Sequence, residues 1–111
     1  MNCVYITKAN KFLPNTPIDN DLMEAFLGKI NEAASRAKRV VLRNNGIQTR
    51  YYALDTQGNP THTNTELTCL AIEGLLDDRF RAEDIEVLSC GTSTPDTLLP
   101  SHAAMVHGLL R

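Results

Sequence analysis

The sequence predicts an α/β fold in which helices pack on a mainly parallel sheet. Stretches with helical spacing of apolar residues alternate with short β-forming runs, in the order β-α-α-β-α-β-α. Helices that stand between strands are typical of parallel sheets. Only the runs near residues 3–7 and 85–90 are apolar enough for core strands, and two strands make a thin sheet for four helices.

The first half of the chain is expected to contain one strand and two helices. Residues 3–7 are rich in β-forming side chains, and Asp19 or Asn20 is placed to cap the helix that follows two prolines. A second helix is expected over about residues 32–43, and Gly46 stops it because glycine favours the positive φ of a helix C-cap. The apolar stripe of the first helix consists of Leu22, Met23, Phe26, Leu27 and Ile30.

The second half is expected to contain two strands, each followed by a helix. Residues 47–54 form a polar-interleaved strand, and Thr63 with Glu66 matches the capping box that opens a helix. Residues 84–89 form a strand with an apolar centre, and a last helix begins near Ser101, just after a proline.

Length and composition restrict the class of protein. A chain of 111 residues with 42% hydrophobic side chains is ordinary for one globular domain and excludes collagen-like and disordered chains. No apolar run approaches the roughly 20 residues of a membrane helix, and the start of the chain does not resemble a signal peptide. We therefore expect a cytoplasmic protein whose three cysteines, which lack zinc-binding spacing, are reduced thiols.

Positive charge gathers in residues 29–50. This segment holds six basic side chains against Glu32 alone, although the whole chain carries a net charge of −2. The pattern indicates an anionic partner, either a phosphate-bearing ligand or an acidic protein, but a solvated helix face explains it as well. The segment lacks the interleaved aromatic residues of single-strand nucleic-acid binders, so no nucleic-acid partner is expected.

The sequence shows no complete catalytic or metal-binding constellation. His102 and His107 are five residues apart and so lie on different faces of a helix, while His62 lies in a loop. Cys90 ends a strand before a glycine, but no neighbour that would lower its pKa is evident, so a structural thiol is the favoured interpretation. The Gly91–Pro95 turn lacks the second glycine of a nucleophile elbow. We expect neither a metal nor a cofactor.

Three groups of residues follow one another along the chain. They are Val4–Thr7 with Phe12–Pro14 and Asn20-Asp21, then Asn45–Ala53 with its glycine-isoleucine-x-x-arginine pattern, then Gly91–Asp96 with Leu99–Ser101. Together they resemble the N-terminal part of the β-ketoacyl-acyl-carrier-protein synthase III family. The residues at 43–47 and 50–55 are most similar to the branch that makes dialkylresorcinol-type lipids.

The resemblance implies that residues 1–111 belong to a thiolase-like domain, which is built from two similar α/β halves. Members of the family transfer an acyl group to a cysteine and condense it with a second thioester in a decarboxylating Claisen reaction. Their nucleophilic cysteine, histidine and asparagine lie beyond the part that this chain matches. The resemblance therefore assigns no catalytic residue here, and the isolated chain is expected to be inactive.

A peripheral set of binding residues follows from the same resemblance. The family's arginine before glycine-isoleucine, which helps to hold coenzyme A, aligns with Asn44, and Arg43 is one position away. Arg50 matches the arginine that follows. Leu99 takes the place of an apolar residue that lines the acyl pocket across the dimer interface. The implied ligands are coenzyme A or acyl-carrier-protein thioesters, and the implied assembly is a homodimer.

Two further hypotheses stay open beside this one. A non-catalytic α/β module would bind an acidic protein through the basic residues 29–50. Alternatively, unpaired sheet edges and exposed apolar helix faces would make the chain associate with itself.

Overall fold

Helices and strands mix in one chain, as the composition and periodicity predict. The computed structural model describes residues 3–110, and within that range it contains four α-helices and one two-stranded antiparallel sheet. The mixed α/β class is therefore confirmed, whereas the expected parallel sheet is wrong. The chain divides into two compact units, Leu13–His62 and a second unit that joins Met1–Phe12 to Thr63–Arg111.

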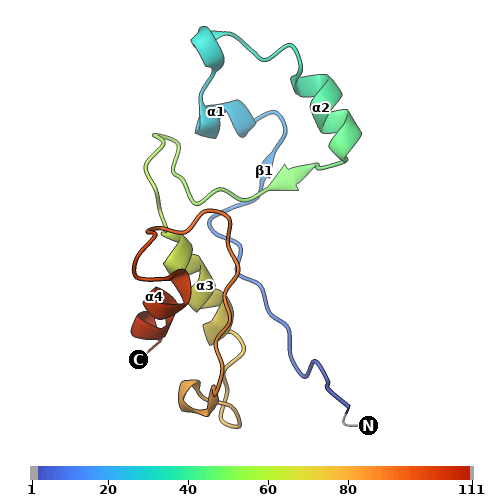
Figure 1. Ribbon diagram of the computed structural model, residues 1–111. Helices are drawn as coiled ribbons and strands as arrows, with labels where there is room; N and C mark the ends of the chain where they lie inside the picture. Colours follow the sequence, from blue (N-terminus) through green and yellow to red (C-terminus); the bar gives the residue numbers. More distant parts are fainter. Residues whose placement is uncertain (1–2, 111) are drawn as a thin grey trace. The chain divides into compact units, whose positions relative to one another are not determined.

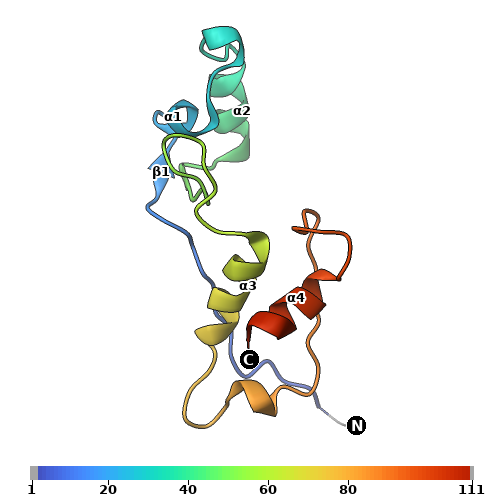
Figure 2. The same cartoon turned by 90° about the vertical axis from the view of Figure 1, so that its left-hand side faces the viewer.

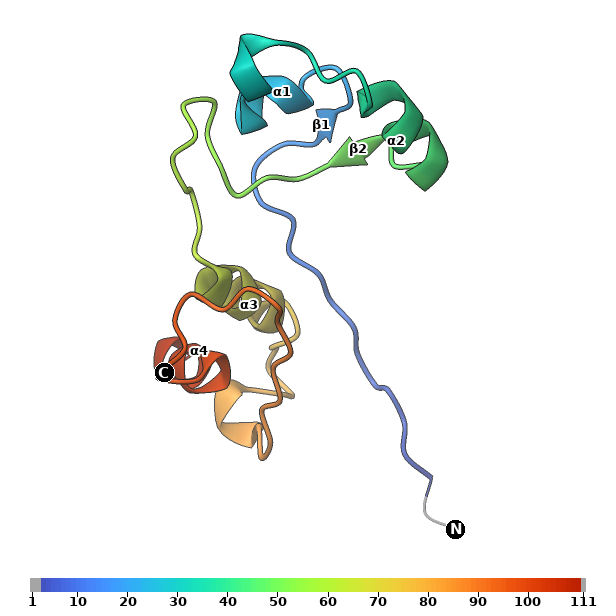
Figure 3. The ribbon, with the colours of Figure 1, turned by 45° about the horizontal axis from the view of Figure 1, so that its top comes forward.

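The sheet belongs to the unit Leu13–His62. Its strands are β1 (Ile18–Asp19) and β2 (Thr49–Arg50), paired with Ile18 opposite Arg50 (Figure 3). The sequence did not predict β1, because two residues after a proline carry no period-2 pattern. A parallel arrangement requires a helix that returns the chain along the length of the strand. Here α1 (Met23–Leu27) ends after five residues at Gly28, and the chain doubles back instead.

Both helices of this unit are shorter than the sequence predicts. The Asp19 carboxylate accepts hydrogen bonds from the backbone N–H groups of Asp21 and Leu22, in the turn before α1. The N-cap of α1 is Leu22, which makes no side-chain cap hydrogen bond, so the prediction that Asp19 or Asn20 caps this helix is wrong. After a 3-10 turn (Ile30–Glu32), α2 covers Lys38–Asn45. It starts later than expected because Asn31 and Glu32 adopt positive φ, which interrupts helical hydrogen bonding. Gly46 ends it with φ of 68°, as predicted.

The core of the other unit lies between α3 (Asn64–Glu73) and α4 (His102–Leu109), which pack side by side (Figures 1 and 2). Val106 is fully buried, and the Cys69 thiol beside it lies 3.7 Å from the Val106 carbonyl oxygen. The predicted capping box is confirmed, since Thr63 and Glu66 each accept from the other's backbone N–H. No helix within residues 3–110 is long and apolar enough to cross a membrane.

The N-terminal segment is attached to the C-terminal end of α3. The Lys8 amine donates to the Leu75 carbonyl at 3.0 Å and pairs with Asp77, and the Asn10 amide donates to the Ala71 carbonyl at 2.8 Å. These bonds satisfy carbonyl groups that the end of a helix leaves without partners. A Cβ at Gly74 would lie 2.0 Å from the Asn10 amide nitrogen, so any other residue there would displace the Asn10 side chain from this position.

The two strands expected at residues 3–7 and 84–89 are not strands in the structure. Residues 3–7 are extended coil, with Val4 95% and Ile6 92% exposed (Figure 1). The second segment begins as a short 3-10 turn (Ala82–Asp84) and continues as coil, with Val87 83% exposed. Both segments are rich in β-forming residues, but a strand also requires a neighbouring strand for its backbone hydrogen bonds. Within residues 3–110 no segment pairs with either of them.

A carboxylate from a distant loop completes the N-terminus of α3. Asp96 accepts hydrogen bonds from the backbone N–H groups of Asn64 and Thr65, each at 2.8 Å, and from the Thr65 hydroxyl. The Thr65 hydroxyl contributes most to holding the pKa of Asp96 below its usual 3.8, because it bonds the charged form. The negative charge also suits the positive end of the α3 dipole.

The lowered pKa of Asp96 predicts a pH dependence of stability. Its contribution to the free energy of unfolding is complete above the unfolded-state pKa and is lost as pH falls through the lower folded-state pKa. We expect Asp96→Asn to lower the stability at neutral pH, and the gap to the original protein to narrow below about pH 3.8. Urea denaturation across this pH range measures the gap, and a gap that stays constant with pH would contradict the assignment.

Candidate functional site

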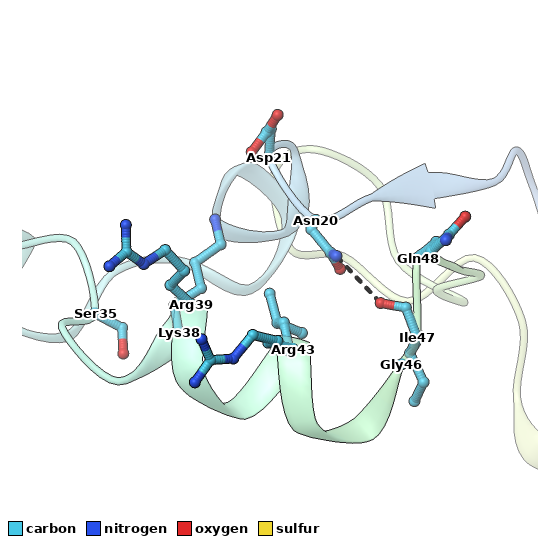
Figure 4. A pocket seen from close by; sticks show the side chains of 10 residues that line it. Asn20, Asp21, Ser35, Lys38, Arg39, Arg43, Gly46, Ile47 and Gln48 are labelled. Atoms are coloured by element: carbon cyan, nitrogen blue, oxygen red, sulfur yellow. Dashed lines mark hydrogen bonds between the residues drawn. The ribbon is translucent and has the colours of Figure 1, made fainter.

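The candidate site is a pocket of about 590 Å³ beside α2, within the unit Leu13–His62. Such a volume suits a small ligand or one end of a larger one. Figure 4 shows the side chains along α2 and at its C-terminal end, with the Asn20 side chain pointing toward Ile47 from the turn before α1. The lining residues are Asn20, Asp21, Ser35, Lys38, Arg39, Leu42, Arg43, Gly46, Ile47 and Gln48.

Three cationic side chains of α2 line this pocket. Arg39 and Arg43 are four residues apart and so share one helix face, and both residues are exposed. Lys38 is partly buried and lies 3.7 Å from the Glu24 carboxylate, which offsets part of its charge. No ion pair joins Arg39 or Arg43 to a carboxylate within residues 3–110. Their guanidinium groups therefore supply most of the pocket's uncompensated positive charge.

The carboxylate of Glu24 orders one side of the pocket. One of its oxygens faces Lys38, and the other accepts a hydrogen bond from the Ser35 backbone N–H at 3.2 Å. Because both partners line the pocket, this single acidic residue of α1 fixes the start of α2 against the pocket. Asp21 also lines the pocket and adds one negative charge to it.

Asn20 connects the opposite walls. Its amide nitrogen donates to the Ile47 carbonyl at 3.1 Å, and its amide oxygen accepts from the Arg50 guanidinium at 2.6 Å (Figure 4 shows the first bond). The second terminal nitrogen of Arg50 is buried without a hydrogen-bond partner among residues 3–110. Asn20 thereby holds the segment after α2 next to the turn before α1.

The residues that the family resemblance singled out are dispersed in the structure. Arg43 lines the pocket, whereas Asn44 is exposed on α2 and lies outside the lining. Arg50 lies behind the pocket, where it bonds Asn20. Leu99 is 86% exposed in the other unit, in the loop before α4. The structure thus places Arg43 in the lining of the pocket and Arg50 outside the lining, bonded to Asn20.

The thiols and imidazoles form no reactive pair within the described residues. Burial raises the pKa of the Cys69 thiol, which makes it a poor nucleophile, and the ring nitrogen Nε2 of His102 hydrogen-bonds the Thr68 hydroxyl at 3.0 Å. His102 is the first residue of α4, so its helix-terminal position is as predicted, although it is buried. No group of three potential metal ligands occurs within residues 3–110.

Sequence reasoning identified the basic segment but missed the polar residues that complete the pocket. Ser35 lies in no motif, Gln48 fills an unspecified position of the glycine-isoleucine-x-x-arginine pattern, and Asn20 was considered as a helix cap and as part of the Asn20-Asp21 pair. No local signal connects Asn20 with Ile47 and Arg50, which lie 27 and 30 positions away in the sequence.

The pocket is suited to holding an anion. Arginine forms paired hydrogen bonds with phosphate and carboxylate groups, and Ser35 and Gln48 add polar side chains to the same lining. No known protein-family model matches this sequence. The chemistry of the pocket is therefore the main ground for assigning a function, and the motif resemblance is a second ground.

The connecting role of Asn20 leads to a stability prediction. Asn20→Ala leaves the partly buried Arg50 guanidinium and the Ile47 carbonyl without their partner, which costs roughly 1–3 kcal/mol of unfolding free energy. Asn44→Ala makes the same chemical change at an exposed position of α2 and should cost under about 0.5 kcal/mol. Urea denaturation of both variants checks the prediction, and equal losses would show that the Asn20 bridge is not stabilising.

Proposed function

We propose that the pocket beside α2 binds the phosphate-bearing end of an acyl thioester, as part of an acyltransferase that resembles β-ketoacyl-acyl-carrier-protein synthase III. The observation that carries the proposal is the presence of Lys38, Arg39 and Arg43 in the lining of one pocket. Coenzyme A and the phosphopantetheine arm of a carrier protein share the required chemistry, since both carry phosphate next to amide groups.

The three cationic side chains differ in whether a carboxylate pairs with them, and this difference supports a phosphate ligand. Lys38 is anchored by Glu24, so it holds its position without the full strength of its charge. Arg39 and Arg43 are exposed and share a helix face, which allows two guanidinium groups to bind one phosphate or two adjoining phosphates. The Asp21 carboxylate is an acceptor for the amide or hydroxyl donors of the same ligand.

The part of this chain in such a reaction is binding. No cysteine and no histidine line the pocket, and the resemblance assigns no catalytic residue to residues 1–111. The family reaction forms a thioester on a cysteine, attacks its carbonyl carbon with the carbanion left by decarboxylation, and stabilises the oxyanion with hydrogen-bond donors. In this proposal the pocket holds the thioester carrier while other residues perform those steps.

A second candidate function is the docking of an acidic protein on α2. Val40 is 51% and Val41 is 55% exposed next to Arg39 and Arg43, so this helix presents an apolar and basic surface together. Such a surface suits a protein partner whose association is steered by charge. The pocket volume favours the small ligand, and a thioester carried by an acidic carrier protein would use both features.

Neutralising the two arginines should abolish most of the binding. We expect Arg39→Gln with Arg43→Gln to weaken coenzyme A binding at least about tenfold, because each lost charged hydrogen bond is worth about 1.5–3 kcal/mol. Lys29→Gln with Arg36→Gln removes the same charge from the basic segment outside the pocket lining and should leave affinity within about threefold. Calorimetric titration gives both affinities.

The choice of ligand separates the two candidates. Pantetheine, which lacks phosphate, should fail to bind, whereas 4′-phosphopantetheine should bind and lose affinity in the Arg39/Arg43 double variant. Equal weakening in both double variants would mean that only the general charge of residues 29–50 matters. Binding of an acidic carrier protein without any binding of 4′-phosphopantetheine would favour the docking surface.

A further inference from the structure

Asn45 and Gly46 form the one asparagine-glycine pair of the sequence, and the pair lies at the edge of the pocket. Asn45 is the last residue of α2 and is exposed, and Gly46 is both the C-cap and a lining residue of the pocket. The proposed function assigns no role to the Asn45 side chain.

The side chain of Asn45 folds back over the following peptide. Its amide oxygen accepts a hydrogen bond from the Ile47 backbone N–H at 2.9 Å, which is the geometry of an Asx turn. The hydrogen bond closes a ring that contains both the side-chain amide carbon of Asn45 and the Gly46 nitrogen. The Ile47 N–H also withdraws electrons from the side-chain carbonyl of Asn45. It is placed to stabilise the negative charge that develops on the side-chain oxygen during attack.

Gly46 adds no side chain that would crowd the ring closure. A Cβ built at Gly46 meets no atom within 4 Å, so the space where other residues carry a side chain is open. The Gly46 N–H donates to the Leu42 carbonyl at 3.2 Å, in the last hydrogen bond of α2. Terminal helical bonds open more readily than internal ones, so this nitrogen becomes available without unfolding the helix.

We propose that Asn45 is a site of spontaneous deamidation, which converts a neutral amide at the edge of the pocket into a carboxylate. The deprotonated Gly46 nitrogen forms a bond to the Asn45 side-chain carbon, and the bond from that carbon to Nδ2 breaks. The amide nitrogen leaves as ammonia, and the product is a five-membered succinimide. Water then adds to one of the two imide carbonyls and breaks its bond to nitrogen, giving aspartate or isoaspartate without oxidation or reduction.

The other asparagines lack this combination. Asn15, Asn20 and Asn64 use their amide nitrogens in hydrogen bonds to more distant residues, and each is followed by a residue with a side chain. Asn59 precedes Pro60, whose nitrogen carries no hydrogen to lose. Asn44 is exposed on the same helix but is followed by Asn45, so it is the matched internal comparison.

Deamidation changes the electrostatics of the site. A carboxylate at position 45 lies at the negative end of the α2 dipole, two residues from Arg43, and opposes the positive charge of the pocket. Isoaspartate also lengthens the backbone by one carbon between α2 and Gly46. Weaker binding of phosphate ligands therefore follows, and this consequence alone rests on the proposed function.

Peptide mapping by mass spectrometry tests the modification directly. The folded 111-residue protein is incubated in mildly alkaline buffer, and the deamidated fraction is followed separately at Asn45 and Asn44. We expect deamidation at Asn45 to be several-fold faster than at Asn44, and to disappear at that position in Asn45→Gln, which would have to close a less favourable six-membered ring. Circular dichroism confirms that the variant is folded. Equal rates at Asn45 and Asn44 would overturn the proposal.

A separate titration tests the consequence for the pocket. Asn45→Asp should bind 4′-phosphopantetheine several-fold more weakly than Asn44→Asp, which adds the same charge one residue away from the pocket edge. Equal affinities would overturn the effect on binding. If the original protein binds no phosphate ligand, the proposed function fails, but the deamidation rates, which require no ligand, still decide the modification.

Discussion

The geometry of the pocket depends on the amide group of Asn20. Through one hydrogen bond to the Ile47 carbonyl and one from the Arg50 guanidinium, this side chain joins the turn before α1 to the segment after α2. The sheet that would otherwise hold these segments has two residues in each strand, and Ile18 is the buried apolar side chain that supports it. Side-chain hydrogen bonds therefore replace much of the packing that positions binding residues in larger domains.

The charges around this pocket consist of one ion pair and a surplus on one helix face. Glu24 compensates Lys38 and orders Ser35, and within residues 3–110 Asp21 is the one acidic residue of the lining. What remains is the positive charge of Arg39 and Arg43, placed on a short helix whose C-terminus Arg43 also stabilises. A ligand with more than one negative charge gains most from such a surface, and added salt weakens its binding.

A single added charge changes the net charge of this pocket by a large fraction. Because two arginines dominate the surplus, a single new carboxylate at position 45 alters the balance substantially. The same glycine that ends α2 with positive φ has open space where other residues carry a side chain. The helix stop and the proposed deamidation of Asn45 therefore both depend on the lack of a side chain at Gly46.

Local signals in the sequence were the most reliable predictors of structure. The Thr63–Glu66 capping box and the Gly46 stop each depend on residues close in the chain, and each is confirmed. The strands at 3–7 and 84–89 were wrong because pairing depends on distant partners, which β-forming composition does not specify.

The candidate pocket follows the same division between local and distant contacts. Charge patterning located Arg43 and its neighbours, since a run of basic residues is visible in the sequence. It could not show that Arg50 bonds Asn20, or that Ser35 and Gln48 line the same pocket as the arginines. Those relations join residues up to 30 positions apart, and only the fold brings them together.

The most direct measurement of the central claim is a map of backbone amide chemical shifts during titration with coenzyme A. The account predicts that the largest changes fall on Asn20, Asp21, Ser35 and residues 38–48, with little change on α3 and α4. Saturating changes confined to that set would locate the ligand in the pocket beside α2. Changes centred on residues 64–110, or none at all with coenzyme A in excess, would contradict the assignment of this pocket as a phosphate-binding site.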